Sequence, residues 1–362
     1  SITGIASMLA FIENQATGNG GGAYIEGTLT CTSSHRLQFL KNKAKQSGGG
    51  LYCKSDVTLK NLTGQTLFQE NSAEQNGGGI CLDAEKSLIL DTLDNFVLQS
   101  NTSSQSGGGA YIPKAFTLTH TSPEPDAEFL PVYGAATIIG NSASENGGGI
   151  FSKLVSFSNL SSITIDANKA TKSGGGLFSG TEVQTTASSQ PVAKKPTASY
   201  HIMADADKKS TREAPEENAD CNFDYTTNVT ITNNTAGESG GGLYGKIGEF
   251  SRIDALTIQG NSATKSGGAL YFEESLNVTK IVNGTFSGNS AKQSGGGIYA
   301  KALTLENLPG EISLSDNTLD NASPTTMLGG GIYAETCSLN NISGTFLCSK
   351  NKINDTSTTD GT

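Results

Sequence analysis

The chain has 362 residues, of which 45 are glycine and none is tryptophan, with a formal net charge of -10 and 16% charged residues. Because a phosphate backbone selects a basic surface and no Lys/Arg cluster is present, we expect no nucleic-acid binding. No run of about 18 apolar residues occurs, so we expect no membrane-spanning segment in this chain. Residues 1–10 lack the charged start of a signal peptide, and we interpret the chain as a segment of a longer protein.

A repeat runs along the chain from Phe11 to Asn351. Each copy contains an apolar residue, an Asn three positions later and a glycine run, which begins six residues after the Asn in nine of ten copies. Undisturbed steps between copies are 27 to 30 residues. Repetition at this period predicts a solenoid that forms a single domain over residues 1–362.

Each period contains three short runs with strand character, as residues 51–53, 57–59 and 66–68 illustrate. Three strands of about five residues joined by tight turns close one triangular coil. Glycine and Asn accept the positive φ values that such turns need, so we expect few helices. The sequence therefore predicts an all-β fold, a right-handed parallel β-helix of about ten coils of three strands with two long loop insertions.

The two residues that directly follow each glycine run differ in type from each other. The first is always aliphatic and predicts an inward column; the second is nearly always aromatic and predicts an outward column, because successive strand residues point to opposite faces. The outward rings either stack on one another with their hydroxyls in water or form a binding stripe. The candidate binding surface consists of Tyr24, Tyr52, Tyr111, Tyr244, Tyr271, Tyr299 and Tyr333.

The remaining repeat positions have structural interpretations. We expect each Asn to bond to turn backbone and to the Asn of the next coil and to tolerate a left-handed conformation, and we expect the glycines to serve turns and close packing. A phosphate-binding loop is not predicted, since no Lys-Ser/Thr pair follows the glycines. These structural residues are Phe11, Asn14, Phe39, Asn42, Phe68, Asn71, Asn141, Asn168, Asn234, Asn261, Phe286, Asn289, Gly21, Gly49, Gly78, Gly108, Gly148, Gly175, Gly241, Gly268, Gly296 and Gly330.

Two steps of the repeat are long, with 40 residues between Gly109 and Gly149 and 66 between Gly176 and Gly242. Because a coil has a fixed perimeter, the extra residues are expected to leave as loops, at about 113–133 and 181–225. Both are polar and Pro-containing, which suits either disorder or a partner-contacting loop. A smaller insertion is expected at 319–327.

The titratable residues do not form a reactive set. The six cysteines include no CxxC pattern, so no metal or cofactor is predicted; they are either buried small side chains or cross-links, with Cys221 as the best cross-linking candidate. A β-helix glycosidase needs two or three converging carboxylates, but Asp56, Asp166, Asp254 and Asp316 stand at unequal phases of the repeat. The histidines, His35, His120 and His201, lie outside the repeated motifs. No catalytic residue and no enzyme activity are predicted.

The pairing of Gly-Gly-Ala/Gly-Ile/Leu with Phe-x-x-Asn, repeated over about residues 11–351, resembles the passenger domains of the chlamydial polymorphic membrane proteins. The resemblance implies an autotransporter passenger segment at the bacterial cell surface, in the outer membrane or secreted, which acts as an adhesin. Its expected partner is a host-cell surface receptor, protein or glycan, with self-association possible through the exposed ends of the solenoid. Alternatives are a polysaccharide-cleaving β-helix enzyme and a purely structural envelope component.

Overall fold

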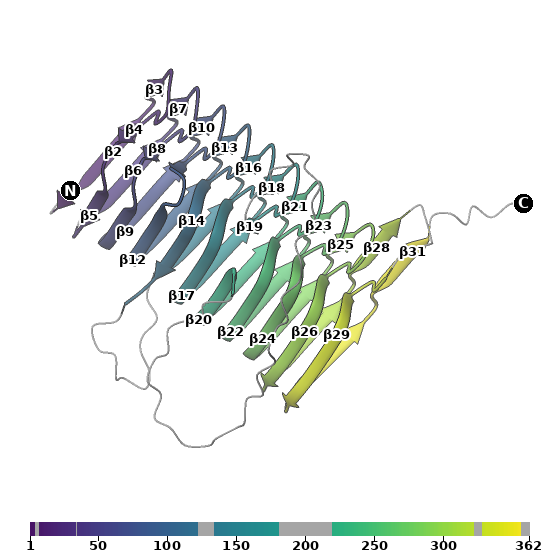
Figure 1. Cartoon of the computed structure of the whole chain (residues 1–362). Helices are drawn as coiled ribbons and strands as arrows, with labels where there is room; N and C mark the ends of the chain where they lie inside the picture. The colour runs from purple at the N-terminus through teal and green to yellow at the C-terminus, as the bar shows by residue number, and fades with distance from the viewer. Residues whose placement is uncertain (4–6, 34, 122–133, 181–218, 322–327, 356–362) are drawn as a thin grey trace, which may run out of the picture.

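The computed structural model describes residues 1–3, 7–33, 35–121, 134–180, 219–321 and 328–355. These residues form a parallel β-helix, in which strands one repeat apart pair in register and in parallel. Figure 1 shows the coils stacked in chain order along one axis, from the N-terminal strands to β31. The described residues contain no helix, and the predicted solenoid is confirmed.

The larger sheet has 20 strands. It contains the strand after each glycine run and the strands that lead to each repeat Asn. Its members are β1 (Ile2–Thr3), β2 (Met8–Ile12), β4 (Ala23–Ile25), β5 (Leu29–Thr32), β6 (Arg36–Leu40), β8 (Leu51–Cys53), β9 (Val57–Gln69), β11 (Ile80–Leu82), β12 (Ser87–Gln99), β14 (Ala110–Thr119), β15 (Ala135–Ile139), β17 (Ile150–Asp166), β19 (Leu177–Ser179), β20 (Cys221–Thr232), β22 (Leu243–Gln259), β24 (Leu270–Ser287), β26 (Ile298–Leu308), β27 (Glu311–Ser315), β29 (Ile332–Ile342) and β30 (Thr345–Ser349).

The smaller sheet has 11 short strands, one directly after each Asn. Its members are β3 (Gln15–Ala16), β7 (Lys43–Ala44), β10 (Ser72–Ala73), β13 (Thr102–Ser103), β16 (Ser142–Ala143), β18 (Lys169–Ala170), β21 (Thr235–Ala236), β23 (Ser262–Ala263), β25 (Ser290–Ala291), β28 (Thr318–Asn321) and β31 (Lys352–Asp355). The sequence analysis did not predict this sheet, because a strand of two residues is too short to show an alternation of apolar and polar side chains.

The strand runs differ in one respect from the prediction. The second and third runs of the example period form the continuous strand β9, and β24 joins all three runs over 18 residues. The chain turns within long strands at residues of positive φ, such as Tyr225 (47°) in β20. In the same coil it turns between strands at Asn233 (55°) and Gly240 (67°).

The left-handed residue at the Asn corner is the one before the Asn, and the expectation that the Asn itself takes this conformation is wrong. Its φ lies between 53° and 65° in all eleven coils that have the corner, at Glu13, Lys41, Glu70, Ser100, Gly140, Ala167, Asn233, Gly260, Gly288, Asp316 and Lys350. The Asn side chain is thereby aimed into the turn rather than strained by it.

The core fills the inside of the coils. The aliphatic residue after each glycine run is buried in the central coils, for example Ile80 and Leu243 at 0% exposure. Phenylalanines from successive coils stack inside, with ring centroids 4.6 Å apart for Phe11–Phe39 and 4.7 Å apart for Phe39–Phe68. Since each coil buries its apolar faces against its neighbours, stability comes from stacking of coils.

The middle glycine of each run is required by the backbone of the next coil. A Cβ atom on Gly241 would lie 2.1 Å from the carbonyl oxygen of Gly268, and one on Gly268 would lie 2.0 Å from that of Gly296. Contacts below about 3 Å are forbidden for a real Cβ, so the coils approach too closely at this column for any side chain.

The two long insertions are shorter than predicted. Residues 113–119 belong to β14 and residues 221–225 to β20, so these ends of the predicted loops at 113–133 and 181–225 are strand. Residues 122–133, 181–218 and 322–327 lie outside the described residues, as do His201 and the end of the chain from residue 356. Gly180 donates its N–H to the carbonyl oxygen of Ser152 at 2.9 Å, and Val155 donates to Asp220 at 2.8 Å. The second insertion thus leaves and returns on the same coil edge.

Candidate functional site

An asparagine ladder runs inside one corner of the solenoid, here called the asparagine corner. Asn261 illustrates each step: its Nδ2 donates to Oδ1 of Asn289 at 3.0 Å and to the carbonyl oxygen of Ile231 at 2.8 Å, and its backbone N donates to the same Oδ1 at 2.9 Å. The members are Asn14, Asn42, Asn71, Asn101, Asn141, Asn168, Asn234, Asn261, Asn289, Asn317 and Asn351. The nine from Asn42 to Asn317 are at most 1% exposed. Because their polar atoms are satisfied within the ladder, these residues hold coils together.

The aromatic column lies on the outside of the strands after the glycine runs. Its rings stack from coil to coil: centroids are 5.0 Å apart for Tyr244–Tyr271, 4.6 Å for Tyr271–Tyr299 and 4.9 Å for Tyr299–Tyr333, with interplanar angles of at most 15°. Tyr24 and Tyr52 stack in the same way at 5.5 Å, and Tyr111 stacks on Phe151 at 4.8 Å. Stacking covers the ring faces, so this candidate binding surface presents ring edges and hydroxyls.

The surroundings of the column are acidic. Tyr244 donates its hydroxyl hydrogen to Glu273. Burial raises the pKa of Tyr271 to about 12, with Tyr299 and Glu273 adding to the effect. Cys81 takes the place of an aromatic residue between Tyr52 and Tyr111 and is 3% exposed, which divides the column into two stacks. The tyrosine hydroxyls of both stacks can donate or accept hydrogen bonds.

A second corner of the coil, here called the variable corner, carries a left-handed residue of changing type. Its members have φ between 47° and 56° and are Ser33, Asn61, Thr92, Asn159, Tyr225, Arg252, Lys280, Asn307 and Asn341. The strand registers on either side place these residues over one another. In the coil between Thr92 and Asn159, the first insertion leaves after Thr121 and returns at Gly134, at this same corner.

Tyr225 is the most exposed aromatic residue of the described chain, at 47%. The guanidinium of Arg252, from the next coil, lies over its ring with its carbon 4.1 Å from the ring centroid. Asp224 accepts a 2.9 Å hydrogen bond from Nε of Arg252 and a second bond from its Nη2, so the guanidinium is fixed by a bidentate pair. The sequence analysis did not single out this group; the spacing of one period between Tyr225 and Arg252 was the signal that could have found it.

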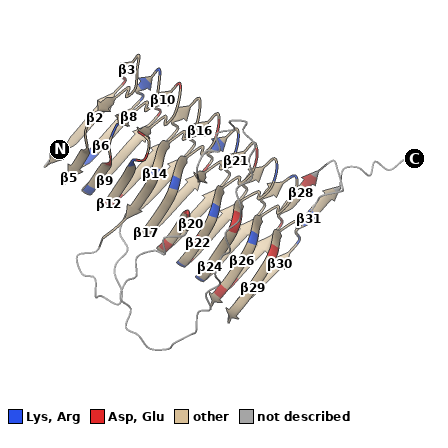
Figure 2. Ribbon diagram, viewed as in Figure 1, with Lys and Arg blue, Asp and Glu red and all other residues tan. Residues whose placement is uncertain are grey.

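Charged side chains elsewhere pair between neighbouring coils. The nitrogen–oxygen distances are 2.8 Å for Lys60–Asp91, 3.2 Å for Lys246–Glu274 and 3.2 Å for Lys265–Glu238. Figure 2 shows Lys and Arg scattered among Asp and Glu over the described chain, without a continuous stripe of one sign. Such pairs favour the correct stacking register, and each contributes little at an exposed site.

Two of the acidic residues weighed for catalysis make hydrogen bonds between coils. Asp56 accepts a 2.8 Å hydrogen bond from the backbone N of Ser87, and Asp166 accepts one of 2.7 Å from Thr232. His35 lies 3.4 Å from the hydroxyl of Thr63, and burial lowers the pKa of His120. Within the part of the chain that the structure describes, no group of three or more His, Cys, Asp or Glu residues could hold a metal ion.

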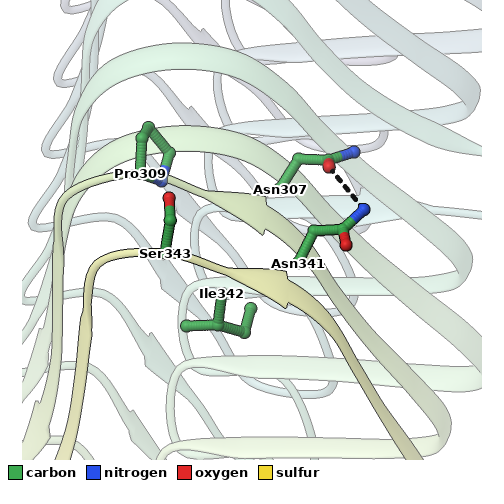
Figure 3. Close-up of a pocket in the computed structure, with 5 residues that line it drawn as sticks. All are labelled: Asn307, Pro309, Asn341, Ile342 and Ser343. Atoms are coloured by element: carbon green, nitrogen blue, oxygen red, sulfur yellow. Dashed lines mark hydrogen bonds between the residues drawn. The ribbon is translucent and has the colours of Figure 1, made fainter. Parts of the chain in front are cut away.

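Hollows on the described surface include one at the variable corner and one along the small sheet. One, of 410 Å³, lies at Asn307, Pro309, Asn341, Ile342 and Ser343, where Nδ2 of Asn341 donates to Oδ1 of Asn307 at 3.2 Å (Figure 3). The other, of 590 Å³, follows the small sheet from β3 to β16 and is lined mainly by Ala, Ser and Thr. Neither contains a carboxylate pair suited to glycoside cleavage.

Four of the six cysteines are buried, whereas Cys337 and Cys348 are exposed. The interpretation of Cys53 and Cys81 as small buried side chains agrees with their burial, whereas Cys221, the expected cross-linking candidate, is 0% exposed in β20. Burial raises the pKa of Cys221 and keeps it protonated. Its position next to a long insertion suggested access to solvent, but the strand begins directly at this residue and turns its side chain into the core.

The fold, the asparagine ladder and the aromatic column define a parallel β-helix repeat protein with aromatic rings stacked on its outside. Six segments match the Chlamydia polymorphic membrane protein repeat, at residues 36–54, 65–83, 135–153, 228–246, 255–273 and 283–301. Each of them joins the strand before the Asn to the strand after the glycine run, which is the stacking unit of the coil.

Relatives with the same repeats are similar along most of the chain. Probable outer membrane protein PmpB of Chlamydia trachomatis is 35% identical over 359 residues, 89% of this chain and 20% of the relative. Probable outer membrane protein PmpB of Chlamydia muridarum is 38% identical over 326 residues, which cover 89% of this chain and 19% of the relative. Probable outer membrane protein pmp20 of Chlamydia pneumoniae is 44% identical over 168 residues, which cover 45% of this chain and 10% of the relative. No solved structure is significantly similar.

The chain therefore belongs to the chlamydial polymorphic membrane protein family. It spans about a fifth of the PmpB relatives' length or less. The relatives are named as outer membrane proteins and not as enzymes, and the chain is assigned to the bacterial outer membrane or cell surface. Among the described residues, no helix has the length and apolar character needed to cross a bilayer.

Proposed function

We propose that this chain is a surface-exposed segment of an autotransporter passenger and acts as an adhesin toward host-cell receptors. The observation that carries the proposal is the division within each coil. The asparagine corner repeats almost unchanged and holds the coils together. The variable corner presents changing side chains to solvent, and the aromatic column presents ring edges and hydroxyls. A rigid scaffold with a variable outer surface is suited to display of binding residues.

The test uses beads coated with the segment on cultured epithelial cells. The proposal predicts attachment above that of albumin-coated beads and competition by excess soluble segment. Attachment equal to that of albumin-coated beads would contradict the adhesin role and favour a structural envelope component.

The contribution of the second insertion can be tested separately. Because Gly180 and Asp220 are fixed to the same coil edge, residues 181–218 can be replaced by a short turn without opening the coil. We predict a folded rod; reduced attachment would assign receptor contact to the insertion, and unchanged attachment would assign it to the rod itself. A pull-down from host-cell surface extract then identifies the receptor.

A further inference from the structure

Tyr225 is unusual in its place on the variable corner. The backbone there is left-handed, which Asn adopts readily and a bulky aromatic side chain disfavours. Four other coils use Asn at the same place, namely Asn61, Asn159, Asn307 and Asn341. A bulky exposed residue in a conformation that it disfavours lowers the stability of the rod, and such residues gather at functional sites.

The ring of Tyr225 is held in a fixed orientation. The Arg252 guanidinium lies over one ring face, and Asp224 fixes the guanidinium through two hydrogen bonds. Little side-chain freedom remains to be lost when a partner binds. The group therefore presents a preorganised ring edge and hydroxyl to solvent.

The position of the group on the rod also points to recognition. The first insertion leaves the variable corner two coils before Tyr225, and the second insertion returns to the rod at Asp220, just ahead of Tyr225 in β20. The described residues that flank both insertions thus lie within a few coils of β20, which carries the strained tyrosine.

We propose that Tyr225 and Arg252, braced by Asp224, form a contact point for a host-cell surface protein, an inference that rests on the adhesin function proposed above. Tyrosine and arginine concentrate binding energy at protein interfaces. The charge of Arg252 is matched by Asp224, so the group offers no net positive charge to a polyanionic glycan. The complementary surface is a neutral pocket that takes the ring and offers an acceptor to its hydroxyl.

The test compares Tyr225→Asn with the control Lys41→Asn, which changes an exposed left-handed residue at the asparagine corner, outside the variable corner. Asn relieves the backbone, so Tyr225→Asn should unfold at the same temperature as the wild type or higher, while attachment of coated beads falls about tenfold or more. Lys41→Asn should leave attachment unchanged. Brief trypsin treatment of the cells should abolish wild-type attachment, and enzymatic removal of surface glycans should not.

The outcomes separate this contact from the function on which it rests. If beads coated with the wild-type segment attach no better than albumin-coated beads, both the adhesin role and the proposed contact at Tyr225 are rejected. Wild-type attachment that survives Tyr225→Asn rejects the contact alone. Attachment lost on removal of glycans but kept after trypsin treatment overturns the choice of a protein partner.

Discussion

The two corners of the coil follow opposite rules. At the asparagine corner, every described coil has the same residue, and its amide bonds to the neighbouring coil within the core. At the variable corner, the backbone turns with the same left-handed geometry, but the residue type differs from coil to coil, from the small Ser33 to the bulky Tyr225. The difference shows that uniformity follows from burial. A buried amide must find its hydrogen-bond partners in the neighbouring coils, whereas a side chain that faces water can bond to solvent, so its type can change.

The largest effect is expected at the glycine column next to the asparagine corner. Gly241→Ala places a Cβ 2.1 Å from the Gly268 carbonyl oxygen and should cost more than about 3 kcal/mol of unfolding free energy, because only backbone could move to relieve the contact. Urea denaturation measures the loss. Gly27→Ala is the matched control, since nothing lies within 4 Å of its Cβ. Equal stability of the two variants would show that the coils are not so closely stacked.

Removal of one rung of the ladder should have the next largest effect. Asn261→Ala removes the buried oxygen that accepts from Asn234 and the Nδ2 group that donates to Asn289 and to the Ile231 carbonyl. The loss of these buried hydrogen bonds should cost about 2–4 kcal/mol. The control is Asn228→Ala, an exposed Asn whose partner in the next coil is Ala255. Similar urea midpoints for both variants would contradict a stabilising contribution of the buried ladder hydrogen bonds.

The aromatic column should contribute less. Tyr271→Ala removes stacking at 5.0 Å and 4.6 Å and should cost about 1–3 kcal/mol, whereas Tyr271→Phe keeps both stacks and should be close to wild type. Thermal unfolding compares them. A loss as large in Tyr271→Phe would show that the hydroxyl, and not ring stacking, is the stabilising part.

The smallest effect is expected at the ion pair Lys60–Asp91. Burial raises the pKa of Asp91, but hydrogen bonds from Lys60, Thr121 and Thr92 outweigh it and lower the pKa overall. A lowered carboxyl pKa gives stability that is present above the ordinary value of about 3.9 and is lost as the pH falls below it. Asp91→Asn should therefore lower the melting temperature slightly at pH 7.

The pH series provides the check for this pair. The difference in melting temperature between wild type and Asp91→Asn should shrink as the pH is lowered from about 5 to about 3, through the ordinary carboxyl pKa of about 3.9 and toward the lowered pKa of folded Asp91. A constant difference over this range would mean that the loss came from packing and not from the charge.

Much of the fold could be predicted because packing forces the same residue to recur every coil. The inward aliphatic column, the Asn ladder and the close-packing glycines all follow from one period laid over the next. Features of a single coil could not be predicted in this way. The burial of Cys221 depends on where β20 begins after an insertion, and the strain at Tyr225 depends on a backbone angle that no neighbouring residue type reveals.

The candidate site was predicted in part. The aromatic column lies on the outer face, as the alternation of inward and outward strand residues predicted. The sequence could not decide whether the ring faces are covered, because that depends on a spacing of about 4.8 Å between coils. The Tyr225–Arg252–Asp224 group was missed because its members have no repeat motif. Its residues meet only when two coils are stacked in register.

The most direct test of the division between the two corners is the attachment of Asn261→Ala beads at a temperature at which this variant is still folded. The account predicts attachment equal to that of the wild type despite the lowered melting temperature, since the ladder is buried and touches no partner. Weaker attachment of beads coated with the fully folded Asn261→Ala variant would contradict the claim that the asparagine corner serves stability alone.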